Sequence, residues 1–119
     1  MLQYLPESQG HILGVKVNGK FTNRDYQEFL VPRLEDLIKA HGRVRVLLYL
    51  DNDFQGWELE AIRSNPFGIQ HKDDFQKIAV VGGSWRLRLE MKLVTSFLAG
   101  EVRNFSREDL PAAWTWLRA

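Results

Sequence analysis

The stretch that decides the fold is Val44-Arg45-Val46-Leu47-Leu48-Tyr49-Leu50, an almost unbroken apolar run followed by the polar residues Asp51-Asn52-Asp53. A strand that is apolar on both faces is typically buried in a sheet with helices on both sides. A second run of this kind occurs at Lys77–Gly82. We therefore predict that these two runs are the innermost strands of a mostly parallel sheet.

Helical patterns alternate with these strands. Apolar residues recur at helical spacing between Thr22, whose hydroxyl suits an N-cap, and Gly42, which suits a helix end, while Pro32 predicts a kink. The predicted helices cover residues 22–41, 57–64, 85–98 and 106–117. The predicted strands cover residues 2–5, 11–17, 44–50, 77–82 and 101–105, the first two of which form a hairpin.

The element order ββαβαβαβα predicts an α/β fold. We expect a mixed, mostly parallel sheet of four to five strands packed by about four helices. The length of 119 residues fits one domain, residues 1–119. The first strand is the expected antiparallel exception, because a short turn joins it to the second.

Composition excludes several classes of function. The chain has no cysteine, which rules out disulfides, thiolate metal sites, iron–sulfur clusters and a cysteine nucleophile. Its 16 basic and 15 acidic residues give a net charge of +1, so no nucleic-acid partner is expected. No apolar run approaches the roughly 20 residues of a membrane span, and the first residues do not resemble a secretory signal. These features predict a cytoplasmic domain.

The chemical motifs are weak. Asp51-Asn52-Asp53-Phe54-Gln55-Gly56 imitates the start of a calcium loop, but Ile62 stands where a bidentate glutamate is needed. The simpler interpretation is that Asp53 or Gln55 caps the next helix, although the carboxyl end of a strand is also where open α/β sheets place ligands. Gly82-Gly83-Ser84 suits either an anion site or, more simply, a glycine turn with a serine cap. We expect no metal, no cofactor and no enzymatic activity.

Five segments together resemble the SpoIIAA-like family, in the same order and at similar spacing. They are Leu5-Pro6-Glu7-Ser8, Gly19-Lys20-Phe21-Thr22, Asp53-Phe54-Gln55-Gly56-Trp57, Ala79-Val80-Val81-Gly82 with Trp85 close behind, and Ala113-Trp114-Thr115-Trp116-Leu117. This family has the STAS-type fold and is related to CRAL-TRIO lipid-binding domains. The STAS resemblance implies a non-enzymatic interaction module, and the CRAL-TRIO relation implies a pocket for lipophilic ligands.

One segment departs from the family pattern. In anti-sigma-factor antagonists of this fold, an Asp-Ser-Ser-Gly-type segment follows the third strand, and phosphorylation of its serine switches partner binding. The corresponding segment here is Asp53-Phe54-Gln55-Gly56. Because it has no serine, the resemblance does not carry that phosphoserine switch to this chain.

The predicted helix at residues 85–98 carries two apolar stripes at 100° per residue. The first stripe contains Leu87, Met91, Val94 and Leu98. The second contains Leu89, Leu93 and Phe97, with Trp85 beside it. A helix that lies on a sheet needs about one stripe, so the second must be covered by a neighbouring helix, a partner, a ligand or a membrane. The simplest of these interpretations is that a neighbouring helix covers the second stripe.

These features predict that the chain is a non-catalytic binding domain for a lipophilic or amphipathic ligand. We expect it to make peripheral contact with the inner face of the membrane. We expect the helices near Trp57 and Trp85 to flank the pocket and to change their separation with ligand. The candidate ligand-binding residues are Asp53, Phe54, Trp57, Phe67, Trp85, Leu89, Leu93 and Phe97. The alternative is a STAS-type protein-interaction or regulatory domain without the phosphoserine switch, for which a protein partner or a homodimer is expected.

Overall fold

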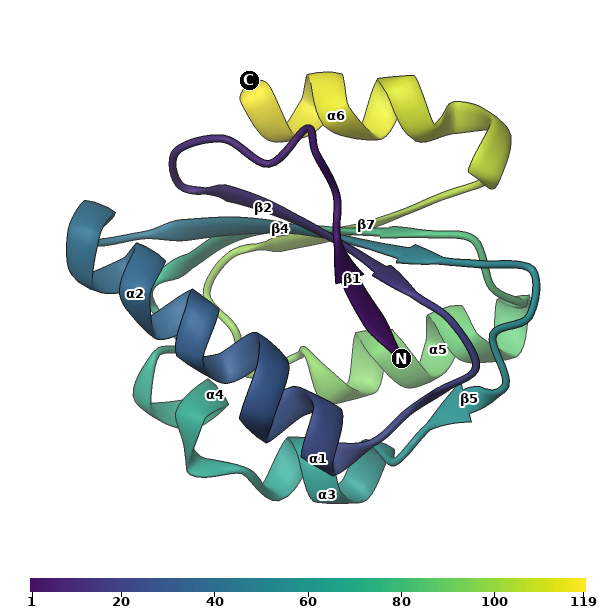
Figure 1. The fold of residues 1–119 in the computed structure, drawn as a ribbon, viewed down its shortest axis with the longest axis horizontal. Coiled ribbons are helices and arrows are strands. Elements are labelled where there is room, and N and C mark those ends of the chain that lie inside the picture. The colour runs from purple at the N-terminus through teal and green to yellow at the C-terminus, as the bar shows by residue number, and fades with distance from the viewer.

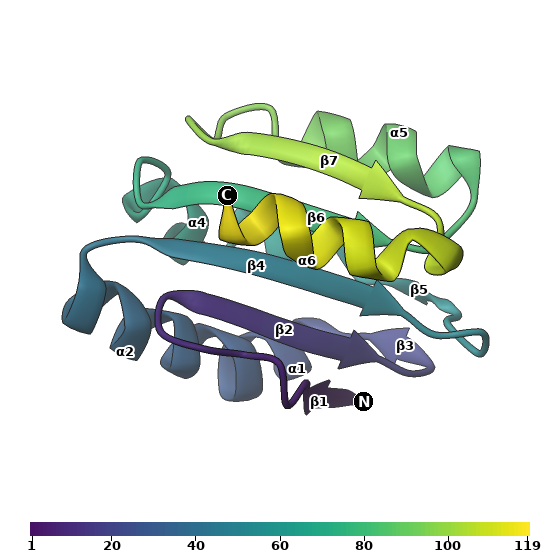
Figure 2. The same ribbon diagram turned by 90° about the horizontal axis from the view of Figure 1, so that it is seen from above.

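Five strands form one mixed sheet in the computed structural model, which describes residues 1–119. The spatial order is β1 (Leu2–Tyr4), β2 (Ile12–Val17), β4 (Val44–Leu50), β6 (Phe75–Val81) and β7 (Glu101–Phe105). Only β1 is antiparallel to its neighbour. The predicted α/β fold is therefore confirmed, with β4 and β6 both inside the sheet (Figure 2).

Helices cover both faces of the sheet, but unequally (Figure 1). One helix, α6 (Leu110–Arg118), lies on the face drawn uppermost, preceded by a 3-10 turn at Arg107–Asp109. The lower face carries α1 (Asn23–Asp25), the π-helical turn η1 (Tyr26–Leu30), α2 (Val31–His41), α3 (Leu59–Ser64), α4 (Pro66–Gln70) and α5 (Trp85–Val94). In this lower layer α2 lies toward β2 and α5 lies toward β7 (Figure 2).

Alternation along β4 divides the core between the two faces. Val46, Leu48 and Leu50 belong to a cluster of 18 buried residues below the sheet. Leu47 points the other way, into a cluster of six buried residues that includes Trp114 of α6. An inner strand with helices on both sides must be apolar on both faces, which explains why β4 reads as a continuous apolar run.

The first long helix is interrupted just before Pro32. Thr22 and Asp25 form a capping box at its start, and Gly42 ends it with a φ of 74°. Between them the five residues of η1 adopt a π-helical turn rather than the predicted simple kink. Pro32 has no backbone N–H to donate to the preceding turn, so the local hydrogen-bond pattern changes there.

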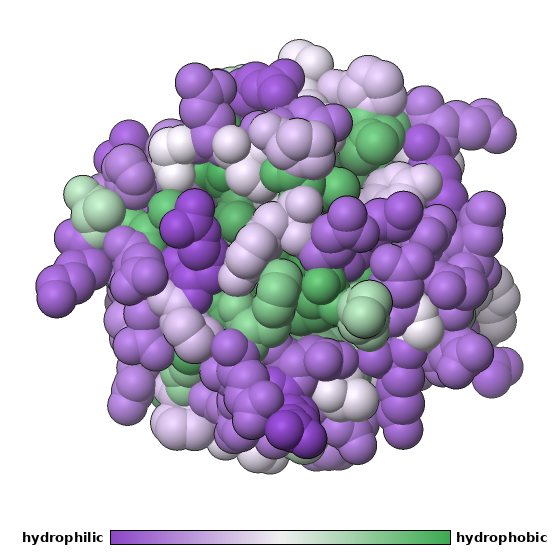
Figure 3. Space-filling model, viewed as in Figure 1, coloured by the Kyte–Doolittle hydropathy of each residue, from purple (hydrophilic) through white to green (hydrophobic).

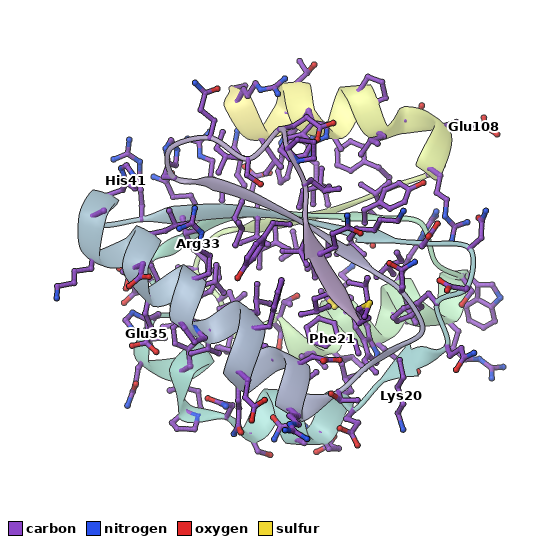
Figure 4. All side chains as sticks on the ribbon, viewed as in Figure 1. Lys20, Phe21, Arg33, Glu35, His41 and Glu108 are labelled. Carbon is purple, nitrogen blue, oxygen red and sulfur yellow. The ribbon has the colours of Figure 1, made fainter.

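A two-stranded parallel sheet was not predicted from the sequence. It joins β3 (Lys20–Phe21) to β5 (Gly56–Trp57). Phe21 points into the layer between the main sheet and the helices, whereas Lys20 points away from it (Figure 4). The pairing places Trp57 in a strand, so the predicted helix at residues 57–64 is wrong at its start.

His11 lies in a positively charged setting at the start of β2. Its ring centre is 6.2 Å from that of His41, and its buried Nε2 has no hydrogen-bond partner. Burial, followed by the charges of Arg43 and Arg45, lowers the pKa of His11 below the ordinary value of 6.5. The unfolded chain therefore takes up this proton more readily than the folded protein does.

We expect acidification to destabilise the protein through His11. Protonation of His11 does not lower the free energy of unfolding above about pH 6.5. Its destabilising effect grows as the pH falls from there toward the lower pKa of His11 in the folded protein. Urea unfolding at pH 7.5 and pH 5.5 measures the loss. The His11→Gln variant should lose less stability than the wild-type protein over this interval. Equal losses in the two proteins would contradict the role of His11.

Candidate functional site

An apolar pocket lies beneath the sheet, between the two sides of the lower helical layer. Its volume is about 120 Å³, and 15 of its 18 lining residues are hydrophobic. Val46 of β4 and Ile78 of β6 form part of its roof, and Ile62 of α3 and Gly68 of α4 approach from the opposite side. The pocket is thus built where the sheet is covered by short helices rather than by one long one.

The side walls of the pocket come from helices far apart in the sequence. Leu34 of α2 lines one side, and Met91 and Val94 of α5 line the other. Phe97 and Leu98 follow α5 and continue its wall. The first apolar stripe predicted for this region therefore faces inward.

The second stripe is exposed to solvent. Trp85 is 68%, Leu89 54%, Leu93 76% and Phe97 38% exposed. Met91 is the only buried residue of α5. The expectation that a neighbouring helix covers this stripe is therefore wrong for Trp85, Leu89 and Leu93, whereas Phe97 rests against Gly68 of α4.

Exposed apolar groups of this size are unevenly distributed over the molecule. The face that carries β1 and α2 is mainly hydrophilic, with hydrophobic side chains confined to small areas between polar ones (Figure 3). Most of the large hydrophobic residues that are exposed lie instead in or just after α5. Contiguous exposed apolar surface usually marks a site of interaction.

Few polar groups reach the pocket. The Trp57 indole N–H donates to Glu90 Oε2 over 3.3 Å and so links β5 to α5. The Thr95 hydroxyl is already occupied, because it donates to the carbonyl oxygen of Met91. Tyr26 lines the pocket with a hydroxyl that forms no hydrogen bond within the chain, and burial raises its pKa to about 12. The phenol is therefore neutral and free to donate one hydrogen bond.

A family model described as SpoIIAA-like matches residues 12–118. This chain belongs to the SpoIIAA-like family. The crystal structure of an uncharacterized protein of the DUF3478 family from Shewanella loihica PV-4, which has a SpoIIAA-like fold, is similar at a TM-score of 0.68 and 25% sequence identity, covering 98% of this chain and 93% of that one. No protein with curated annotation matches. The SpoIIAA-like fold agrees with the predicted STAS-type architecture.

The SpoIIAA-like domain brings together only some of the predicted ligand-binding residues. Trp57 and Phe97 line the pocket. Phe54 stands behind Trp57, with the two rings edge-to-face at 5.8 Å. Phe67 is 5% exposed and belongs to the core, although its neighbour Gly68 lines the pocket. Three further predicted residues lie on the outer face of α5 and not in the pocket: Trp85, Leu89 and Leu93.

Asp53 lies away from the pocket of this SpoIIAA-like domain, at the carboxyl end of β4. Its Oδ1 accepts from the Asn18 side-chain amide at 3.3 Å and from the Gly19 backbone N–H at 3.4 Å. It therefore ties two loops together and does not cap a helix, since α3 follows Glu58 and has no side-chain cap. Nearby, the Asn52 backbone N–H lowers the pKa of Asp51, with Lys16 adding to the effect.

Several residues of the pocket were missed as ligand contacts. Tyr26, Leu34, Ile62 and Met91 have the helical spacing of core residues, and that spacing does not distinguish a packed interior from a pocket. Tyr26 differs from the other three because it places a phenol on an otherwise apolar helix face. No helix of the SpoIIAA-like domain has both the length and the apolar character needed to cross a membrane.

Proposed function

We propose that this SpoIIAA-like chain is a non-catalytic binding domain that holds a lipophilic or amphipathic molecule in the pocket beneath its sheet. The observation that carries the proposal is the position of α5. Its inner side walls an apolar pocket, while Trp85, Leu89 and Leu93 on its outer side remain exposed. One helix thus joins an internal apolar space to an external apolar surface.

The size of the pocket supports a narrow ligand. Its volume of about 120 Å³ is close to the roughly 150 Å³ of an engineered apolar cavity that stays dry and binds benzene. The end of an alkyl chain or a single ring fits this space. Burial of apolar surface stabilises by about 25 cal/mol per Å², before the cost of association is subtracted.

Charge on α5 supports contact with an anionic membrane surface. Arg86, Arg88 and Lys92 are exposed on this helix, and its one carboxylate, Glu90, accepts from the Trp57 indole. Each basic residue near an anionic membrane contributes about 1 kcal/mol to binding. Apolar side chains flanked by such cations are typical of interfacial helices.

In this proposal, α5 moves away from β5 and α3 when a ligand occupies the pocket. Met91 is the only fully buried residue of this helix, and Leu87 packs against the core while partly exposed. The hydrogen bond from Trp57 to Glu90 is 3.3 Å long and joins the two sides of the pocket. Its loss on opening costs about 1 kcal/mol, an amount that ligand burial offsets readily.

The Leu93→Asp variant tests the membrane part of the proposal. Because Leu93 is 76% exposed, we expect the variant to remain folded, with a melting temperature close to that of the wild-type protein. Co-sedimentation with phosphatidylglycerol vesicles should fall by at least tenfold, since the carboxylate adds both desolvation cost and repulsion. Vesicles of phosphatidylcholine should bind the wild-type protein more weakly.

A matched control is the Ala112→Asp variant, which introduces the same charge at an exposed position of α6. It should co-sediment with the vesicles as the wild-type protein does. If the Leu93→Asp variant stays folded and binds vesicles unchanged, the membrane part of the proposal is wrong.

A second candidate is a protein-interaction or regulatory domain, which suits the STAS-type fold. Residues 51–57 contain no hydroxyl side chain, so regulation through phosphorylation of this segment is not part of that candidate. Failure of the wild-type protein to bind any apolar ligand or vesicle would leave this second function as the better account.

A further inference from the structure

A shallow groove adjoins the opening of the apolar pocket. It has a volume of about 340 Å³ and is lined by Arg63, Ile69, Lys72 and Phe97. Two of these residues, Arg63 and Phe97, also line the inner pocket. The groove and the pocket therefore adjoin at these two residues, and a path from solvent to the underside of the sheet can pass between them.

Phe97 separates the two parts of this path. A Cβ atom added to Gly68 would lie 3.3 Å from Cζ of the Phe97 ring, so the ring rests directly against the glycine of α4. The ring is 38% exposed. Because Gly68 has no side chain, this contact leaves the Phe97 ring at the boundary between the groove and the pocket.

Two cations stand at the outer end of the path. Lys72 is exposed and forms no ion pair. Its backbone carbonyl accepts from the Ala99 N–H at 3.1 Å, which fixes Lys72 beside the segment that carries Phe97. The only ion pair of Arg63 is with Glu60, at 3.5 Å, and the two side chains are 58% and 86% exposed.

No carboxylate holds either cation in a buried ion pair. Asp74 contacts His71 at 2.9 Å, Glu60 holds Arg63 only through one long, solvent-exposed contact, and the exposed Asp73 beside Lys72 forms no ion pair. Exposed pairs of that kind are weak. The groove thus presents apolar surface from Ile69 and Phe97 next to two available cations.

We infer that the ligand is a single-chain anionic amphiphile of the fatty-acid type. Its alkyl tail passes Phe97 into the inner pocket, and its carboxylate lies between Arg63 and Lys72. Guanidinium groups bind carboxylates through paired hydrogen bonds, and ammonium groups bind them as point charges. This inference rests on the proposed function, because it assigns a chemical class to the ligand of the same pocket.

The experiment compares decanoate with decanol, which have the same chain length but differ in charge. Isothermal titration calorimetry at pH 7.5 should show that the wild-type protein binds decanoate about fivefold to tenfold more tightly than decanol. In the Arg63→Gln/Lys72→Gln variant this preference should disappear while decanol affinity is kept. The preference of the wild-type protein should also shrink at high salt.

The matched control is Lys39→Gln/Arg43→Gln, which removes two exposed positive charges that do not line the groove. It should keep the preference for decanoate. Equal affinity of the wild-type protein for decanoate and decanol overturns the anionic assignment and leaves the proposed function standing. Absence of binding to either compound overturns the proposed function itself. Equal loss of both affinities in the Arg63/Lys72 variant also overturns the anionic assignment.

Discussion

The Gly100→Ala variant is expected to be strongly destabilised. A Cβ atom at this position would lie 2.1 Å from the carbonyl oxygen of Phe75 and 2.6 Å from that of Gln76. Both obstacles belong to the backbone at the start of β6, which is held in the sheet and cannot move aside. We expect a loss of about 3 kcal/mol in the free energy of unfolding, or roughly 10–20 °C in melting temperature.

Gly68→Ala is the control for this prediction. Its Cβ atom would meet only the ring of Phe97, at 3.3 Å, which can move. Alanine is also the better helix former, by about 0.5–1 kcal/mol. Thermal unfolding followed by circular dichroism should therefore place this variant close to the wild-type protein. Similar melting temperatures for the Gly100 and Gly68 variants would show that the connection from α5 to β7 is more adaptable than the structure indicates.

Filling the pocket should abolish ligand binding without unfolding the protein. Val94 is half-buried on the inner side of α5 and lines the pocket. A phenylalanine there occupies space that is otherwise empty, so the free energy of unfolding should be unchanged or higher by up to about 1 kcal/mol. Decanoate affinity, measured by calorimetry, should fall by at least tenfold because the tail has no room.

The Leu93→Phe variant introduces the same ring one residue earlier, on the exposed side of α5. It should bind decanoate as the wild-type protein does. If Val94→Phe is folded and also retains full decanoate affinity, the ligand does not occupy the space beneath the sheet, and the assignment of the pocket is wrong.

The strands that define the fold were predictable because burial on both faces leaves an apolar run with no alternation. This signal identified β4 and β6, and the SpoIIAA-like resemblance agreed with it. By contrast, β3 and β5 have two residues each, and their pairing joins positions 20–21 to 56–57. No local pattern encodes such a contact. The π-helical turn was visible only as the position of Pro32.

The candidate site was predictable in part. Helical spacing separated the two stripes correctly, but the predicted ligand-binding residues come from the second stripe, of which only Phe97 lines the pocket. Leu89 and Leu93 are exposed, and the inner stripe around Met91 faces the pocket. Spacing gives the angle between two stripes, whereas the stripe that faces inward depends on where the helix sits on the sheet. Arg63 and Lys72 carried no sequence signal, because surface cations are common.

Helix α6 has a consequence for the order in which the chain folds. It alone covers the upper face of the sheet, where Trp114 lies so close to Gly14 that a Cβ there would be 2.5 Å from the indole ring. Arg45 and Lys77 donate to the carbonyl oxygens of Leu117 and Trp116 and hold it in place. During synthesis all five strands leave the ribosome before this helix. Until α6 docks, we therefore expect the nascent chain to expose the apolar residues of this face, including Leu47 and Val81, and chaperones recognise such exposed apolar surface.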